Sequence, residues 1–301
     1  MARRTATPSS ALTSLSKKPS VVIGAVIAVL VCAGLLALVM TRAAGPFVGA
    51  EAESGSIAGS AYVRNDANAS GGSAVQFAPP PPPPSGSGII TLTFDDGQLG
   101  QYNNARPVLM ARGLPATFYF ISDAFGYGGS SMNTTQARQL INDGFEAGNH
   151  TKSHPNLTTL SASGINGQFS TAQSVINTVT GRSPTTCAYP FGSYNGTVDA
   201  EARKFFRSCR GTGQNDNNPA SMNVYNLGAY MMGSSYNASS VAAMAARAKA
   251  NNSWIILLYH GIGPSASLDT DTATFTAQMD AIKNSGVRVM TMGQALTALG
   301  R

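Results

Sequence analysis

Two short polar motifs contain the residues of this chain best suited to hydrolytic chemistry. The first places adjacent carboxylates, Asp95 and Asp96, directly after an apolar run that starts at Ile89. The second places two imidazoles four residues apart, His150 and His154. One carboxylate and two imidazoles match the ligands of a catalytic zinc ion with an open fourth position. The other carboxylate could then accept a proton from the attacking water, because neighbouring acids can take different roles.

Each motif also has an interpretation without chemistry. Asp-Asp-Gly is a common turn sequence, and two histidines four residues apart can be solvated loop residues. The chain has three histidines, however, and the third, His260, directly follows the strand-like run Trp254–Tyr259. All three histidines thus occur in strand-end contexts, where a barrel enzyme collects its catalytic groups. This distribution favours an enzyme.

The order of the motifs resembles that of a known family. The motifs TFDDG and HTKSHP are followed by Tyr189-Pro190-Phe191-Gly192 and by Leu257-Leu258-Tyr259-His260. This order resembles the polysaccharide deacetylase family, the carbohydrate esterases (family 4) that share the NodB homology domain. The resemblance extends from about Ile89 to Arg301. It implies an α/β fold, a deformed (β/α) barrel of about seven repeats, and one divalent metal ion, with Zn²⁺ as the expected one.

The resemblance also implies a role for each site residue. Asp95 corresponds to the general base and His260 to the general acid. The metal ligands are then Asp96, His150 and His154, and the substrate-binding residues are Tyr189, Pro190, Phe191 and Arg210. The implied reaction removes N-acetyl groups from a cell-wall or extracellular polysaccharide of N-acetylglucosamine type and releases acetate. The backbone N–H of Phe191 would stabilise the oxyanion, and His260 would protonate the departing amine.

The chain departs from the family pattern at two points. Ala188 stands where the third motif usually has an arginine that pairs with the base. Arg210, in the next strand-like segment, could reach in and replace it, or could be a structural arginine on the surface. The Asp-Trp motif that orients the acid histidine has no clear counterpart. Asp216 is available, but a turn aspartate is the favoured interpretation.

Two further functions remain open at this stage. The missing arginine would fit a surface protein that binds glycans or acts as a scaffold and whose catalytic activity has decayed. Alternatively, the same site could remove O-acetyl groups, as an acetylxylan-type esterase does. No protein partner is expected. Nucleic acid is not expected either, because five of the 20 basic residues precede Glu51, which leaves 15 basic and 14 acidic residues in the remainder.

The N-terminal part predicts a membrane anchor. Residues 21–40 carry no charge in a run of 20 residues, which as a helix spans roughly 30 Å, the thickness of the hydrocarbon core. The basic residues of segment 1–20 predict a cytoplasmic N-terminus and an extracytoplasmic catalytic domain in the cell membrane. A cleavable signal peptide is the alternative, although its apolar region is usually about 7–15 residues long.

A stalk and a linker are expected between the anchor and the enzyme. Segment 41–78 is small and polar and is similar to a fragment of a carbohydrate-binding module. It is too short to be one, because a closed β-sandwich needs roughly 100 residues. Segment 79–88 begins with six prolines, which form an extended polyproline II helix of roughly 19 Å. The polysaccharide deacetylase domain then comprises residues 89–301.

Within this domain, strands alternate with helices, as a (β/α) barrel requires. The patterns predict strands at 116–121, 186–189, 254–259 and 287–290, and helices at 134–143, 164–180, 198–206, 241–251 and 272–285. Cys187 and Cys209 enter two strand-like segments on either side of one helix, so the strands should be neighbours. The two residues could form a disulfide in an oxidising exterior or remain buried thiols.

Overall fold

The structure is a computed structural model that describes residues 61–65, 73–77, 88–233, 235–263 and 270–301. Contacts divide the chain into two compact units, Met1–Pro79 and Pro80–Arg301. In the first unit, β1 (Ala61–Asn65) and β2 (Ser73–Phe77) form an antiparallel pair. The predicted anchor, most of the stalk and all but the last residue of the linker lie outside the described residues. No described helix combines the length and apolar character needed to cross a bilayer.

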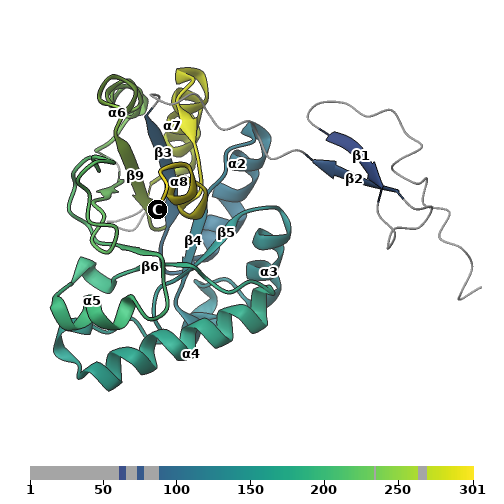
Figure 1. Ribbon diagram of the computed structural model, residues 1–301. Coiled ribbons are helices and arrows are strands. Elements are labelled where there is room, and N and C mark those ends of the chain that lie inside the picture. Colours follow the sequence, from purple (N-terminus) through teal and green to yellow (C-terminus); the bar gives the residue numbers. More distant parts are fainter. Residues whose placement is uncertain (1–60, 66–72, 78–87, 234, 264–269) are drawn as a thin grey trace, which may run out of the picture. The chain divides into compact units, whose positions relative to one another are not determined.

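The second unit is built on one parallel sheet (Figure 1). Its strands are β3 (Ile89–Phe94), β4 (Thr117–Phe120), β5 (Glu146–Asn149), β6 (Thr186–Ala188), β7 (Ser208–Arg210), β8 (Tyr230–Met231), β9 (Trp254–Tyr259) and β10 (Arg288–Val289). Seven of them follow the order β7-β6-β5-β4-β3-β9-β8. β9 pairs along the whole of one edge of β3, so β10 and β4 share the other edge. The result is a half-barrel of seven strands, consistent with the predicted deformed (β/α) barrel.

The two ends of this sheet are linked by the chain that leads into β8. Leu227 forms a parallel bridge with Arg210 at the end of β7. A few residues later, Tyr230 and Met231 pair with β9. The segment therefore contacts β7 at one end of the strand order and β9 next to the other end, and the carboxyl ends of these strands surround one region.

Helices lie outside the sheet, with α3 beside α4 and α6 beside α7 (Figure 1). They are α2 (Arg106–Arg112), α3 (Thr134–Asn142), α4 (Ala162–Thr180), α5 (Gly196–Ala202), α6 (Ala238–Asn251), α7 (Thr272–Ser285) and α8 (Met292–Ala298). A π-helical turn, η3 (Gln101–Ala105), precedes α2, and four short 3₁₀ turns complete the set: η4 (Ser122–Ala124), η5 (Tyr127–Gly129), η6 (Leu157–Thr159) and η7 (Pro190–Gly192). Local sequence starts these helices: Asn133 and Thr291 form capping boxes, and Asp271 caps α7.

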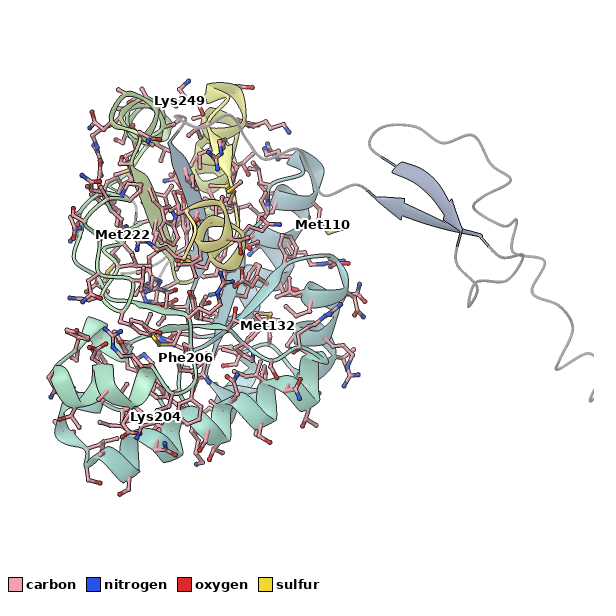
Figure 2. All side chains as sticks on the ribbon, in the orientation of Figure 1. Met110, Met132, Lys204, Phe206, Met222 and Lys249 are labelled. Atoms are coloured by element: carbon pink, nitrogen blue, oxygen red, sulfur yellow. A yellow bond between two sulfur atoms is a disulfide. The ribbon has the colours of Figure 1, made fainter. Side chains whose placement is uncertain are left out.

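Aromatic and aliphatic side chains fill the space between sheet and helices. Phe94 on β3 stacks on Phe118 of β4 and on Tyr259 of β9. Phe275 of α7 meets Tyr259 edge to face. A separate buried cluster lies under α4 and α5, where Phe206, labelled in Figure 2, contacts Phe169 at a centroid distance of 5.1 Å. These contacts hold the strands in register beneath the carboxyl ends.

Most predicted elements are present, with four omissions and one correction. The strand at 254–259 and the helix at 272–285 have the expected bounds. The helix expected at 198–206 is α5, which ends at Ala202, because the chain then turns inward so that Phe206 reaches the core. The sequence patterns did not indicate β5, β8, α2 or α8. β5 reads Glu-Ala-Gly-Asn, a composition depleted in strands.

Candidate active site

The predicted site residues come together at the carboxyl ends of the strands. Asp95 follows β3, His150 follows β5 and His260 follows β9. Arg210 is the last residue of β7, where it pairs in register with Ala188 of β6. Because all these strands are parallel, their carboxyl ends meet on one side of the sheet. Residues far apart in sequence are thereby placed around one centre.

Asp96, His150 and His154 form a cluster suited to one metal ion. One ligand atom from each residue lies within 4.8 Å of the other two. Oδ1 of Asp96 is 3.5 Å from Nε2 of His150 and 3.7 Å from Nε2 of His154. Ligand atoms about 2.0–2.2 Å from a tetrahedral zinc ion are about 3.3–3.6 Å from one another. The three side chains therefore fit a single ion with little movement.

The orientation of His150 is fixed by a backbone carbonyl. Its Nδ1 lies 2.8 Å from the carbonyl oxygen of Ala188 at the end of β6. Because a carbonyl only accepts, Nδ1 must carry the proton, and the lone pair of Nε2 then faces the cluster. Burial, followed by the charge of His150, lowers the pKa of His154. The imidazole of His154 is thus favoured in the neutral form that metal binding requires.

Left-handed backbone conformations accompany the cluster. Asp96 has φ 72°, Thr151 has φ 69° and His154 has φ 59°. Such angles are uncommon for residues other than glycine, and they concentrate at functional sites. Here they turn the chain sharply after β3 and β5, so that two residues from one loop and one from another face a common point.

Asp95 lies beside the cluster, paired with Arg210. A guanidinium nitrogen of Arg210 donates to Oδ1 of Asp95, and Oδ2 lies 3.6 Å from Nε2 of His150. Burial by itself raises the pKa of Asp95, but Arg210, His150 and His260 together lower it below the ordinary value. The carboxylate is therefore held ionised, ready to accept a proton.

The structure decides between the two interpretations of Arg210. Its side chain is fully buried, with 0% exposure, so it is not a surface arginine. It also lies 4.9 Å from the ring centroid of Tyr119. Since Ala188 and Arg210 are register partners, the cation that pairs with the base comes from the strand next to the one that carries the third motif. Burial also means that Arg210 is a positioning residue rather than the substrate contact expected from the sequence.

A buried amide, not foreseen from the sequence, joins the two proposed proton-transfer residues. Nε2 of Gln101, in η3, donates to the backbone carbonyls of Asp95 at 2.5 Å and of His260 at 2.9 Å. This side chain has no exposed surface. Gln101 bonds to backbone carbonyls, which every residue has, so the types of its partners do not reveal the contact. Gln101 therefore fixes the ends of β3 and β9 relative to each other.

The ring of His260, unlike that of His150, has no hydrogen bond to orient its Nδ1 among the described residues. Its Nδ1 is buried without a hydrogen-bond partner among the described residues. Asp216 does not provide one, because it pairs with Arg247 at 2.8 Å and accepts from the hydroxyl of Tyr230 at 2.8 Å. Asp216 is therefore not the partner of His260, and it lies directly before the bridge between Asn217 and Trp254 rather than in the turn expected from the sequence.

Of the expected third-motif contacts, Phe191 is the one with a side chain open to solvent, at 66% exposure. Its ring lies edge-on to His154, with 4.7 Å between centroids, and its φ of 60° turns the backbone at this point. Tyr189 is buried and donates to the carbonyl of Tyr225, and Pro190 is buried as well. Tyr189 and Pro190, which the sequence predicts to bind substrate, are thus buried and shape the turn that presents Phe191.

The chain is thus an α/β protein with a candidate metal site at the carboxyl ends of a parallel half-barrel. Residues 83–206 match the family model "Polysaccharide deacetylase". A chitin deacetylase from Pestalotiopsis sp is 31% identical over 104 residues, which cover 35% of this chain and 34% of that relative. The chain thus spans about a third of that relative's length.

Two solved structures share the fold. The Xyl-CE4 domain of a multidomain xylanase from the hindgut metagenome of Trinervitermes trinervoides superposes with a TM-score of 0.53 at 19% identity, over 71% of this chain and 92% of that one. A CE4 family pseudoenzyme from Bacillus anthracis gives a TM-score of 0.51 at 19% identity, over 70% and 66%. The resemblance to the polysaccharide deacetylase family is thus confirmed over residues 83–206. The family match ends at residue 206, before Arg210 and His260, whose placement rests on geometry alone.

Proposed function

We propose that this chain is a metal-dependent hydrolase that removes N-acetyl groups from an extracellular or cell-wall polysaccharide. One observation carries the proposal: a three-residue ligand cluster lies beside a fourth, separate acid. Asp96, His150 and His154 supply the cluster, and Asp95, held by Arg210, supplies the acid. A site with only structural ion pairs would not need a second carboxylate next to two imidazoles.

The donor set fits a divalent cation, with Zn²⁺ as the favoured one. Two imidazole nitrogens and one carboxylate oxygen are ligands that zinc accepts, and the carbonyl of Ala188 orients the first imidazole. When bound there, a divalent ion would make a water molecule more acidic and would polarise the acetyl carbonyl.

The remaining steps are assigned to residues of the chain. Asp95 accepts the proton of the attacking water, because its pKa is lowered and it remains ionised. We assign donation to the developing oxyanion to the backbone N–H of Phe191, the residue at the exposed turn after β6 whose ring lies edge-on to His154. His260, across the site at the end of β9, gives a proton to the amine nitrogen as the C–N bond breaks.

Names of relatives support the choice of an N-acetylated glycan as substrate. The chitin deacetylase is similar over 104 residues, and a peptidoglycan-N-acetylglucosamine deacetylase from Listeria monocytogenes is 30% identical over 115 residues. Both names describe enzymes that act on N-acetylglucosamine units. We therefore place chitin-type and peptidoglycan-type strands first among candidate substrates.

Acetate release tests the proposal. The zinc-loaded chain is incubated side by side with chitooligosaccharides, purified peptidoglycan and acetylxylan, and acetate is quantified over time. We expect release from one or both N-acetylated substrates and none after removal of zinc by a chelator. Zinc binding without release from any of the three would contradict the proposal.

That last outcome would favour a second function, a glycan-binding protein whose catalysis has decayed. One observation supports it: Nδ1 of His260 lacks an orienting partner among the described residues. The fold alone does not decide, because a structural neighbour of the same fold is described as a pseudoenzyme. Release from acetylxylan only would instead indicate an O-acetyl esterase, which uses the same site on a better leaving group.

A further inference from the structure

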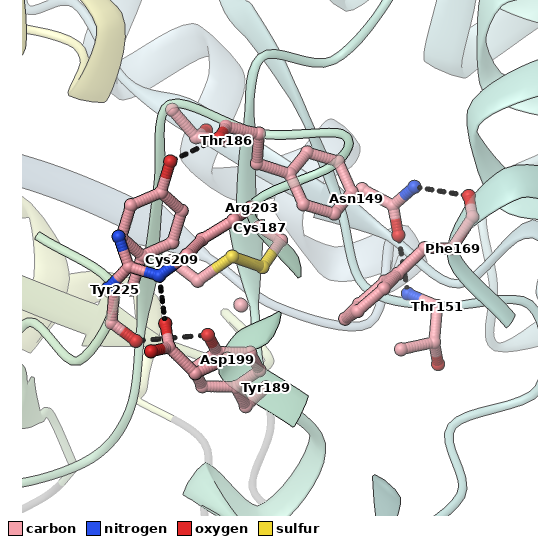
Figure 3. The surroundings of a disulfide bond; sticks show 12 residues. Asn149, Thr151, Phe169, Thr186, Cys187, Tyr189, Asp199, Arg203, Cys209 and Tyr225 are labelled. Carbon is pink, nitrogen blue, oxygen red and sulfur yellow. Dashed lines mark hydrogen bonds and ion pairs between the residues drawn. A yellow bond between two sulfur atoms is a disulfide. The ribbon is translucent and has the colours of Figure 1, made fainter. Parts of the chain in front are cut away.

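A disulfide lies directly beneath the candidate site. Cys187 of β6 and Cys209 of β7 are bonded, and their Cα atoms are 4.4 Å apart (Figure 3). The two residues are also register partners, and Cys187 pairs on its other side with Asn149 of β5. Asn149, Cys187 and Cys209 thus form one row across three strands.

The next residue along each strand belongs to the site. His150 follows Asn149, Ala188 follows Cys187 and Arg210 follows Cys209. The carbonyl of Ala188 accepts from Nδ1 of His150, and the guanidinium of Arg210 pairs with Asp95. Cys187 therefore directly precedes Ala188, whose carbonyl contacts the metal ligand His150. Likewise, Cys209 directly precedes Arg210, which contacts the proposed base Asp95.

Short strands make this bond more important than it would be in a long sheet. β6 and β7 each have three residues, so few ladder hydrogen bonds fix their separation. Both cysteines are fully buried, in a cluster with Phe169 and Tyr189, and this burial leaves them no catalytic role at the surface. A bond between the middle residues of two short strands fixes the spacing of the residues that follow.

We propose that the Cys187–Cys209 disulfide is a positioning element of the active site, which sets the distance between Ala188 and Arg210 and thereby orients His150 and holds Asp95. The inference rests on the proposed metal-dependent function. It predicts that the bond matters for zinc affinity and for turnover separately from its effect on the stability of the fold.

The test compares the full chain with a Cys187→Ala/Cys209→Ala variant. Zinc affinity is measured by competition with a chromophoric chelator, and kcat and KM are measured by acetate release well below each Tm. We expect zinc affinity and kcat each to fall by about 10-fold, the lower end for loss of a residue that supports a metal ligand. KM should not change, because the side chain that faces the substrate, Phe191, is not moved directly.

Two comparisons separate positioning from stability. Ile282→Ala removes a buried side chain from α7, outside the site, and should lower Tm while leaving zinc affinity and kcat unchanged. In an Arg210→Ala background, loss of the disulfide should lower kcat much less than in the wild type, because part of its effect passes through Arg210. Additive losses of kcat, or a lower Tm with unchanged zinc affinity and kcat, would overturn the inference.

Folding and function are kept distinguishable. If the double alanine variant does not fold, two other samples lack the bond. Cys187→Val/Cys209→Ala retains more apolar volume in the core. Reduction of the wild type with a phosphine gives two thiols and phosphine oxide, whose oxygen comes from water. Loss of the fold in all three cases would make the bond a global stabiliser and overturn the inference. If wild type binds zinc but releases no acetate, the proposed activity fails while zinc affinity still tests the bond; wild type that binds no zinc overturns both.

Discussion

Asp95 receives its cation from an unusual place in the sheet. The third motif on β6 has Ala188 at the expected arginine position, and Arg210 of β7 occupies the space instead. A guanidinium on a long side chain can reach across one strand spacing, which is about 4.8 Å. The same electrostatic role is thus filled from a neighbouring strand. The absence of an arginine from β6 therefore does not remove the ion pair with Asp95.

Replacing Arg210 tests that role. Arg210→Ala removes the cation that opposes the effect of burial on Asp95, so the pKa of Asp95 should rise. The acid limb of the kcat/KM profile should then shift to higher pH, and kcat near neutrality should fall by about 10- to 100-fold. Arg210→Lys is the matched variant: it keeps the charge but loses the planar fork, and it should recover part of the loss. An unchanged pH profile would show that Arg210 does not act on the base.

A pair of substitutions separates the base from the metal ligands. Asp95→Asn keeps the shape of the side chain but cannot accept a proton, so turnover should fall by about 10²- to 10⁴-fold while zinc is retained. His154→Ala removes one member of the ligand cluster and should lose both zinc and turnover. Zinc content by elemental analysis and acetate release check both variants. Zinc retained at full occupancy in His154→Ala would contradict the ligand assignment.

At the scale of elements, hydrophobic periodicity predicted the long helices and the longest strands. The apolar positions of segment 272–285 located α7, and the unbroken apolar run of β9 located that strand. β5 was missed because one of its residues, Gly148, is required by the close approach of Tyr119 on the neighbouring strand β4. A Cβ on Gly148 would lie 2.2 Å from Cδ1 of Tyr119, so glycine is required there although it weakens a strand.

The site shows the same division between what sequence predicts and what it does not. The acids and imidazoles were recognisable, because metal ligands and bases need particular side chains. Gln101 and the carbonyl of Ala188 were not, because they act on or through backbone atoms that every residue has. The position of Arg210 depended on strand register, which became known only from the fold.

Helix α8 is attached to the barrel by Glu146, a half-buried residue at the opposite end of β5 from His150. Glu146 accepts from the backbone N–H of Gly293 at 2.9 Å and from the hydroxyl of Thr117 at 3.3 Å. Gly293 lies in the first turn of α8, where backbone N–H groups lack intrahelical partners and a negative charge is favourable. Burial raises the pKa of this carboxyl from its usual value of 4.5, and the hydrogen bonds only partly oppose that rise.

Glu146→Ala should therefore destabilise the fold without changing catalysis. The unpaired Gly293 N–H and Thr117 hydroxyl should lower the free energy of unfolding by about 1–3 kcal/mol. Each kcal/mol should lower Tm by about 2–4 °C. Because the folded pKa lies above the unfolded one, the stabilisation is fully present below the unfolded pKa and declines as pH rises through the folded pKa. The difference in Tm between wild type and variant should thus be larger in acid than at neutral pH. An equal kcat at 25 °C is expected; a lower one would place Glu146 in the catalytic machinery.

At the scale of the whole molecule, the barrel gathers a site from residues spread over more than half of the chain. Asp95 and His260 are 165 positions apart, yet β3 and β9 pair along their full length and place them on adjacent strand ends. The second unit, Pro80–Arg301, contains every proposed site residue. We therefore expect the residues before it to act on location rather than on chemistry.

That expectation leads to a test of the proposed anchor at residues 21–40. Full-length chain should sediment with membranes, resist extraction by alkaline carbonate and dissolve in detergent, because 20 uncharged residues favour a spanning helix. Val31→Lys places a charge mid-span, at a cost of about 2.5–3.5 kcal/mol, and should move chain into the soluble fraction. Ser85→Lys, in the linker, is the matched control. An intact mass that shows cleavage shortly after residue 40 would mean that the segment is a signal peptide and not an anchor. Equal acetate release per folded molecule in the membrane and soluble fractions would confirm that the anchor sets location alone.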